Sequence, residues 1–458
     1  MLTAVVLCFI VGYLTIVFEH PLRLDKTVPA LLMGAICWAL IGIGFNGGSL
    51  SVIDAHDHIH SLTSGHAAEA GHGALESLTE VLFHHFGKTA EILIFLIGAM
   101  TIVELIDLHR GFEVLKGAVK TRSKVKLLWI TGVLGFILSA VIDNLTATIV
   151  LVTLLRKLIP DRTERIWYAS LIIIAANAGG AWSPIGDVTT TMLWIGGKVS
   201  AGGLVGHLVI PSIICFVVPF LIASFLPVFK GEINLPDPDG MKVSKLLSSR
   251  TMLFLGLGGI VFVPIFKTIT HLPPYVGMML SMGVVWLVSE YIHPEENFDD
   301  ERRDKFSGKH ALSRIELSSI LFFLGILMAV AALESVVVGN VGALRFVAEK
   351  LDAAIPNSDV VVVILGFLSA VIDNVPLVAA SMGMYEEPMD AKLWHFIAYA
   401  AGTGGSMLVI GSAAGVAAMG MEKIDFIWYV KKISWLAMAG FLAGAIAYVA
   451  MYSAGLLH

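Results

Sequence analysis

The sequence predicts an all-α polytopic membrane protein with two inverted-topology repeats, each containing a re-entrant helical hairpin and a discontinuous transmembrane helix. Three observations lead to this prediction. The 458 residues are 57% hydrophobic and only 14% charged, whereas soluble domains carry about 25% charged residues. Apolar stretches of about 20 residues, enough to cross a bilayer as a helix, recur along the chain. The hexapeptide SAVIDN occurs at 139–144 and again at 369–374, once in each half of the chain.

The N-terminal segment, 1–88, is predicted to hold two transmembrane helices and an external loop. The first apolar run, 1–19, lacks a basic start and a small-residue cleavage site, so we expect a retained helix. The second helix is expected at 28–45. The stretch 46–87 has no lysine or arginine, and because basic residues mark cytoplasmic loops, the 46–88 loop is placed in the periplasm. Its many histidines are interpreted as a solvated surface, with metal binding or pH sensing as alternatives.

The first repeat, 89–228, contains the first copy of the hexapeptide between two basic segments. Both 109–126 and 156–165 are rich in lysine and arginine, so both are expected on the cytoplasmic side. The stretch between them, 127–155, is too short for two crossings, which need about 40 residues. We therefore predict a hairpin that enters and leaves from the cytoplasm, with the Asp-Asn pair at its tip. Two short tilted spans are the alternative.

The second repeat, 315–458, contains the second copy, and its hairpin is predicted at 360–384. The flanks of this hairpin, 339–359 and 385–392, have few basic residues, and Glu386, Glu387 and Asp390 in the second flank are acidic. Counting spans from the basic loop 300–314, at the end of the connecting segment 229–314, also places these flanks outside. One hairpin from each side of the membrane is the pattern of an inverted-topology repeat.

Each hairpin is followed by an apolar stretch with a glycine pair, at 166–198 in the first repeat and 393–421 in the second. Glycine pairs and Pro184 interrupt a continuous helix, so both stretches are predicted to be discontinuous. Close helix packing at small residues is the alternative explanation. The remaining full spans are predicted at 89–108, 204–228, 251–270, 275–293, 315–338 and 432–453.

Two aspartates at the hairpin tips, Asp143 and Asp373, carry the predicted chemistry. An ionised carboxylate in hydrocarbon is unfavourable unless it takes a proton or coordinates a cation. Sodium prefers oxygen ligands, so we expect Na⁺ and a proton to compete at these two acids; a purely structural hydrogen-bonding role is the alternative. Further candidate oxygen ligands at the tips and breaks are Asn144, Asn374, Ser139, Thr146, Ser369, Asn177, Asp187, Thr189, Thr190, Thr403, Ser406 and Ser412.

Beyond the tips, the two halves have one pair of acids in matching positions and one acid that occurs only in the first half. Glu104 precedes the first tip aspartate by the same interval at which Glu334 precedes the second. They are candidate proton-relay groups, with a solvated position at a helix end as the alternative. Asp187 aligns with Ser412, so the first half has an extra acid and is expected to dominate cation binding.

The chain resembles the NhaD-type sodium/proton antiporters of the ion transporter superfamily. The motifs that carry the resemblance are GAMTIVELIDLHRGF (98–112), SAVIDNLTATIV (139–150), NAGGAWSPIGDVTTTMLW (177–194), SAVIDNVPLVAAS (369–381) and GTGGS from residue 402. The resemblance covers the chain from about residue 89 onward. It implies inverted repeats with re-entrant hairpins, and a homodimer with separate scaffold and transport domains. Many superfamily members that move carboxylates have Ser-Asn-Thr at the tips, and the Ile-Asp-Asn tips here favour a cation instead.

The predicted function is secondary Na⁺(Li⁺)/H⁺ antiport by alternating access, exporting cytoplasmic sodium in exchange for protons across a cell inner (plasma) membrane. The expected partners are Na⁺, Li⁺, protons and the lipid bilayer, with no cofactor, no nucleic acid and no enzymatic activity. One alternative is an anion, oxyanion or carboxylate transporter of the same fold. No lysine or arginine lies within ten residues of either tip aspartate, which disfavours it. A membrane enzyme or metal-handling protein that uses the histidine-rich loop is the other alternative.

Overall fold

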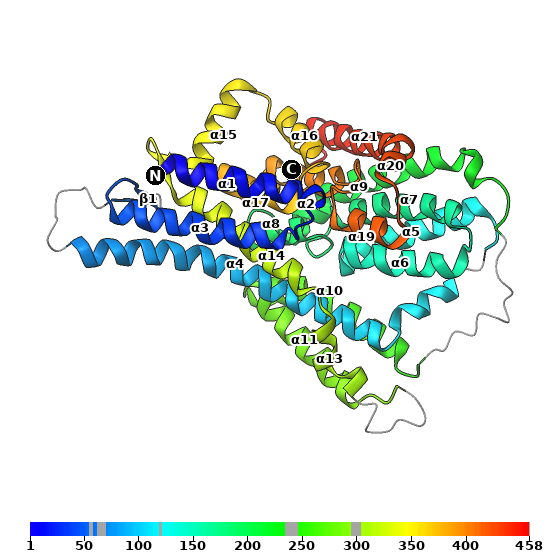
Figure 1. Ribbon diagram of the computed structural model, residues 1–458. Helices are drawn as coiled ribbons and strands as arrows, with labels where there is room; N and C mark the ends of the chain where they lie inside the picture. The colour runs from blue at the N-terminus through cyan, green and yellow to red at the C-terminus, as the bar shows by residue number, and fades with distance from the viewer. Residues whose placement is uncertain (55–57, 62–69, 119–120, 234–245, 295–303, 458) are drawn as a thin grey trace. The chain divides into compact units, whose positions relative to one another are not determined.

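The structure, a computed structural model, describes residues 1–54, 58–61, 70–118, 121–233, 246–294 and 304–457. Helices dominate these residues (Figure 1). In the first half of the chain they are α1 (Leu2–Val17), α2 (Glu19–Leu22), α3 (Thr27–Asn46), α4 (Ala70–Leu108), η1 (Gly111–Ala118), α5 (Lys124–Ile142), α6 (Asn144–Leu158), α7 (Arg162–Gly180), α8 (Val188–Ile195), α9 (Ala201–Ser224) and η2 (Pro227–Phe229).

The second half continues the helical pattern, with short 3₁₀ and α segments between longer helices. Its elements are α10 (Ser249–Thr270), α11 (Pro274–Tyr291), η4 (Asp304–Phe306), α13 (Gly308–Arg314), α14 (Leu317–Ser335), α15 (Ala343–Ala354), α16 (Ser358–Ser369), α17 (Asn374–Met384), α18 (Lys392–Gly404), α19 (Ala413–Glu422), α20 (Phe426–Lys432) and α21 (Ser434–Ser453).

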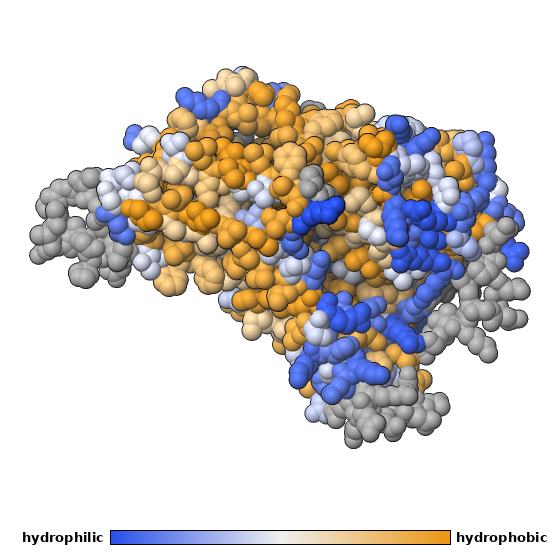
Figure 2. Space-filling model, in the orientation of Figure 1, coloured by the Kyte–Doolittle hydropathy of each residue, from blue (hydrophilic) through white to orange (hydrophobic). Residues whose placement is uncertain are grey.

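Among the described residues, seven helices are long and apolar enough to cross a membrane. They are the apolar part of α4 and helices α3, α5, α9, α10, α14 and α21. Helices α15 and α16, bent by 117° at their junction, add an eighth span if counted together. The predicted helical, multi-span membrane protein is therefore confirmed. Side chains such as Leu7, Val11 and Leu32 are exposed on α1 and α3, and Figure 2 shows a largely apolar surface over these helices.

Two predicted elements differ from the structure, and one helix of the structure is not predicted. Helix α4 begins at Ala70, so the predicted loop 46–88 is helical in its second half; this polar stretch extends a helix without adding a span. Residues 55–57 and 62–69 of the histidine-rich loop lie outside the described residues. The predicted span 1–19 is α1, which has only 16 residues, about 24 Å at the α-helical rise. Helix α15 is absent from the sequence prediction, because its apolar residues lie on one face among charged ones.

Two pairs of very short strands interrupt the helices. Strand β1 (Val52–Ile53) pairs antiparallel with β2 (Ile59–His60), and β3 (Val337–Val338) pairs antiparallel with β4 (Val341–Gly342). An isolated bridge joins Val52 to Val336. Two-residue strands leave no alternating pattern in the sequence, which is why the sequence does not predict them.

The described chain divides into two compact units. The first comprises 1–94, 316–361 and 375–388. Its helices α3 and α14 pack closely, because Gly34 and Gly325 bring the two backbones together: a Cβ on Gly34 would lie 2.7 Å from the Gly325 carbonyl oxygen. Trp38 donates from Nε1 to the carbonyl oxygen of Met328 across the same contact, at 2.8 Å.

The second unit comprises 95–315, 362–374 and 389–458. In it, α5, α6 and α7 pack against one another, α19 packs on α6 and α7, and α9 packs along α21. The two predicted discontinuous helices are interrupted at their glycine pairs, between α7 and α8 and between α18 and α19. Both hexapeptides, up to Asn374, and both interruptions belong to this unit, so the candidate site lies within it.

Candidate functional site

The first hairpin tip is the single residue between α5 and α6. Asp143 has φ +75° and ψ 159°, a backbone region that is essentially restricted to glycine and costs about 1–3 kcal/mol for other residues. Its carboxylate caps α6: Oδ1 accepts from the Thr146 amide at 2.8 Å and Oδ2 accepts from the Thr146 hydroxyl at 2.9 Å. The tip is thus a strained, capped break with a partly buried acid.

Asn177, on α7, connects the first tip to the second discontinuous helix. Its Oδ1 accepts from Asn144 Nδ2 at 3.0 Å, and its Nδ2 donates to the hydroxyls of Ser406 and Ser412, each at 2.9 Å. All four side chains are buried. Both donors of the Asn177 amide are used, so this residue fixes the relative position of the two halves of the site.

The second tip meets the first discontinuous helix through Asp187. Asn374 Nδ2 donates to Asp187 Oδ2 at 3.0 Å, and the Thr189 hydroxyl donates to the same oxygen at 2.7 Å. Asp187 is 3% exposed, and the charges of Asp373 and Asp143 both act on it electrostatically. The structure therefore brings three acids together where the sequence emphasises two.

The predicted serine and threonine ligands mostly hold the backbone. Ser139 donates to the carbonyl oxygen of Ala176 at 2.6 Å, and Ser369 donates to that of Ala401 at 2.8 Å. Each hydroxyl keeps lone pairs that can still face a cation. Two threonines donate in the same way: Thr190 to the Asp187 carbonyl at 2.9 Å and Thr403 to the Tyr399 carbonyl at 2.6 Å.

Glycines bring the hairpins into backbone contact with the discontinuous helices. A Cβ on Gly179 would lie 2.1 Å from the Phe136 carbonyl oxygen, and one on Gly404 would lie 2.2 Å from the Gly366 carbonyl oxygen. The two contacts correspond in sequence, because Gly179 and Gly404 each begin one of the matching glycine pairs, and Phe136 and Gly366 each lie three positions before a copy of the hexapeptide. The close approach leaves no space for a side chain at either glycine.

The two candidate relay acids are in different surroundings. Glu104 forms an ion pair with Arg314 Nε at 3.1 Å, and the same guanidinium contacts Asp107 at 2.9 Å. Glu334 belongs to the first unit, where its carboxylate lies beside Gly383. These contacts do not test the relay role, which stays a prediction for both glutamates.

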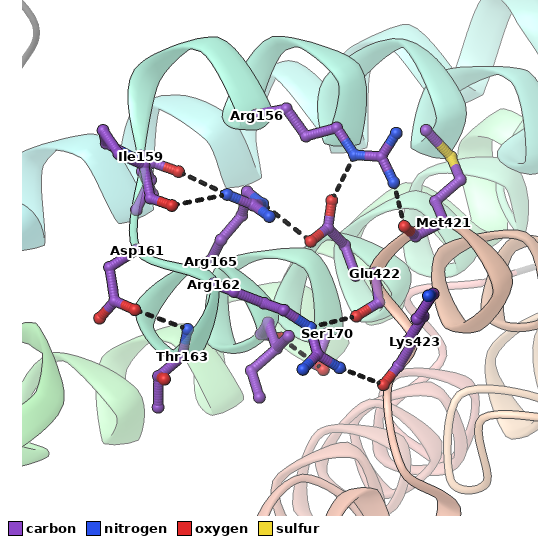
Figure 3. Close-up of polar contacts among 12 residues, drawn as sticks. Arg156, Ile159, Asp161, Arg162, Thr163, Arg165, Ser170, Met421, Glu422 and Lys423 are labelled. Carbon is purple, nitrogen blue, oxygen red and sulfur yellow. Dashed lines mark hydrogen bonds and ion pairs between the residues drawn. The ribbon is translucent and has the colours of Figure 1, made fainter.

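Sequence reasoning missed a buried ion-pair cluster near the end of α19. Glu422, 2% exposed, accepts from Arg156 Nε at 2.7 Å and from Arg165 Nε at 2.8 Å (Figure 3). The only signal in the sequence is the basic segment 156–165, which predicts a loop on the cytoplasmic side. Nothing in that segment identifies an acid in the other half of the chain as its partner.

Buried and partly buried acids, amides and hydroxyls at two helix interruptions can bind a small hard cation or a proton, since every group offers oxygen. The described residues contain no group of three or more His, Cys, Asp or Glu arranged to hold a metal ion, so a transition-metal centre has no support there. A multi-span helical protein with such a polar centre belongs to the class of membrane transporters.

The comparisons identify the family. The citrate-transporter family model, CitMHS, matches residues 13–395, and the chain belongs to this family. A protein of Arabidopsis thaliana named sodium/proton antiporter 1 is 44% identical over 455 residues, covering 98% of this chain and 72% of that relative. The Na⁺/H⁺ antiporter NhaD of Vibrio parahaemolyticus is 31% identical over 427 residues, covering 88% of this chain and 94% of that relative. The resemblance to NhaD-type antiporters is confirmed.

The YdaH transporter of Alcanivorax borkumensis has a similar fold. Its crystal structure superimposes with a TM-score of 0.58 at 14% sequence identity, covering 94% of this chain and 99% of that one. At this identity the likeness concerns the fold alone.

Proposed function

We propose that the protein is a secondary Na⁺(Li⁺)/H⁺ antiporter that exports cytoplasmic sodium in exchange for protons by alternating access. The observation that carries the proposal is a hydrogen-bond network inside one unit, in which Asp187 accepts from the neighbour of Asp373 in the chain, and the neighbour of Asp143 bonds to Asn177. This network gathers the three acids Asp143, Asp187 and Asp373. Their mutual repulsion in a low-dielectric site is relieved by a cation or a proton. The two ions therefore exclude each other, which is the basis of exchange. The names of the relatives support the same pair of ions.

Paired contacts at corresponding positions support two repeats of one design. Ser139 and Ser369 make equivalent bonds, to the carbonyl oxygens of Ala176 and Ala401, each of which lies three positions before a glycine pair. The proposal keeps the repeats at 89–228 and 315–458, with hairpins entering from opposite sides and the 46–88 segment in the periplasm. In such carriers, movement of one element against another exposes a central site to one side at a time. We further propose that the protein forms a homodimer in a cell inner membrane.

A carboxylate substrate, which the family description suggests, is the competing function. An anion needs cationic or amide donors, whereas the tips present the carboxylates of Asp143 and Asp373. The side-chain amides of Asn144 and Asn374 already donate to Asn177 and Asp187. The site thus offers acceptors, which favours a cation.

Proton flux in liposomes reconstituted with the purified protein tests the proposal. A dye trapped inside reports pH changes after pulses of NaCl, LiCl, KCl or sodium-free citrate. Because asparagine caps a helix as well as aspartate, Asp143→Asn keeps a cap on α6 but removes the charge. The matched control is Asp161→Asn, which makes the same change at the exposed cap of α7.

We expect Na⁺- and Li⁺-evoked flux in the wild type and in Asp161→Asn. In Asp143→Asn and Asp373→Asn we expect a loss of about tenfold or more, since losing even about 1.4 kcal/mol of cation binding has that effect. Flux evoked by citrate but not by sodium would instead identify a carboxylate transporter. Full Na⁺-evoked flux in both asparagine variants would refute the assignment of the site.

A further inference from the structure

Two clamps hold the starts of the two discontinuous helices, and their chemistry differs. The first, here called the arginine clamp, consists of Arg156, Arg162 and Arg165 on Glu422 and its neighbours (Figure 3). Besides the two bonds to the Glu422 carboxylate, Arg162 donates to the carbonyl oxygens of Glu422 and Lys423, at 3.0 and 2.6 Å. The start of α7 is thereby tied to the end of α19.

The second, here called the histidine clamp, consists of Asp390, His395 and His207. The Asp390 amide donates to the Lys198 carbonyl oxygen at 2.9 Å, and Asp390 Oδ1 accepts from the Ser200 amide at 2.7 Å. His395 Nε2 lies 3.2 Å from the same Oδ1, and the ring of His395 stacks on His207 of α9 with centroids 4.2 Å apart. The start of α18 is thereby tied to the α8–α9 turn.

The two clamps occupy corresponding positions. Helix α7 starts at Arg162 and α18 at Lys392, the same offset that relates the two copies of the hexapeptide. That offset also relates Arg165 to His395, the fourth residue of each helix. Each clamp joins the start of one discontinuous helix to the chain at the end of the other. Where the first clamp has a guanidinium, which stays charged at every physiological pH, the second has an imidazole, a group that can take up and release a proton.

Because His395 is buried beside a carboxylate, its protonation changes the contact that it makes with Asp390. The side chain is fully buried, and among the described residues neither ring nitrogen has a partner in hydrogen-bond geometry despite the short distance to Asp390. Burial raises the pKa of Asp390, but the hydrogen bonds from Ser200 and the electrostatic attraction of His395 outweigh burial and leave that pKa below its ordinary value. The carboxylate is therefore ionised when a proton reaches His395, and a charge-assisted hydrogen bond replaces an unsatisfied contact.

Neighbouring charges modulate this contact. Protonation of His207, stacked on the same ring, opposes protonation of His395. The other basic groups on these elements, Lys198 and Lys392, place their ammonium groups over the rings of Trp394 and Tyr452, at 4.7 and 4.9 Å from the centroids. Gly203 leaves the space for Asp390, since a Cβ there would lie 2.3 Å from Oδ1.

We propose that His395 is a proton-responsive positioning residue, which when protonated fastens the start of α18 to the α8–α9 turn and when neutral loosens it. The second discontinuous helix is then held more firmly at low pH, while the arginine clamp holds the first one at every pH. This inference rests on the proposed antiport, because its consequence is a pH-dependent rate of helix movement. His395 touches no transported ion in this account.

The test compares the pH profile of Na⁺-evoked proton flux between pH 4 and 8 in the wild type, His395→Gln, His207→Gln and Asp390→Asn. His310→Gln, an exposed histidine of α13, is the matched control. We expect His395→Gln and Asp390→Asn to shift the midpoint of the profile, or flatten it, by about half a pH unit or more. His207→Gln should move the midpoint to higher pH, and the control should leave it in place.

Hydrogen exchange of a peptide covering 389–400, followed across the same pH range, separates this inference from the antiport itself. We expect protection of this peptide to increase at low pH in the wild type and to be insensitive to pH in His395→Gln. If the wild type lacks Na⁺-evoked flux, the proposed function fails, but the exchange measurement still decides the clamp. Equal pH dependence of exchange in the wild type and His395→Gln overturns the clamp.

Discussion

Replacing Gly179 with alanine tests how closely the first hairpin must pack on the first discontinuous helix. Gly179 lies in the last turn of α7, directly beside the backbone of α5. The added Cβ would lie 2.1 Å from the Phe136 carbonyl oxygen. Carbon and oxygen approach to about 3.3 Å even in the closest favourable contacts, so one of the two helices has to move by about 1 Å.

The magnitude follows from two opposing effects. Alanine in a helix is more favourable than glycine by about 0.5–1 kcal/mol. Overpacking of a close contact costs about 1–3 kcal/mol, and the upper end applies here because backbone, rather than a flexible side chain, stands in the way. On this balance we expect a net loss of about 2 kcal/mol in stability and a larger loss of transport, because Asn177 lies in the same helical turn.

Thermal unfolding in detergent and proton flux in liposomes measure the two effects. Gly206→Ala is the matched control, since it is also within a long apolar helix but its Cβ would meet nothing within 4 Å; it should keep transport and lose no stability. Gly404→Ala, with a Cβ 2.2 Å from the Gly366 carbonyl oxygen, should reproduce the Gly179→Ala result. Wild-type stability and flux in both site variants would show that the close backbone contact is unnecessary.

Three further predictions concern charge. Glu422→Gln leaves Arg165, whose side chain is only 13% exposed, without a counter-charge and should lower stability by about 3 kcal/mol or more. The control Glu113→Gln breaks an exposed pair with Lys157 and should change stability by less than about 1 kcal/mol. Thermal unfolding of both variants measures the difference. Burial lowers the pKa of His109 from 6.5 to about 4, so the unfolded chain binds the extra proton between these values and stability should fall by about 3 kcal/mol as the pH drops from 6.5 to 4; His109→Gln, if folded, should lack this dependence. Where protons occupy the site, the sodium concentration for half-maximal flux should rise about tenfold for each unit by which the pH is lowered. A sodium requirement that is constant with pH would contradict competition at Asp143 and Asp373.

The sequence by itself determined the class of the protein and the position of its acids. Three features could be recognised without knowledge of the fold, because each depends only on residues close together in the chain. They are the length of the apolar stretches, the placement of lysine and arginine, and the duplicated hexapeptide. They predicted a helical membrane protein, an unusual break at Asp143 and interruptions at the glycine pairs. They also led to the resemblance to sodium/proton antiporters, which the relatives bear out.

Only the tertiary structure decided which groups meet. Asn374 bonds to Asp187, which lies in the other half of the chain, and Asn177 bonds to Ser406 and Ser412. From the sequence, all of these residues were predicted as ion ligands, with no indication of which of them contact one another. The ion pairs of Glu422 and the stacked histidines beside Asp390 likewise could not be predicted from the sequence. Such contacts depend on how whole helices pack, and packing is set by the summed fit of many side chains rather than by the local pattern around any one of them.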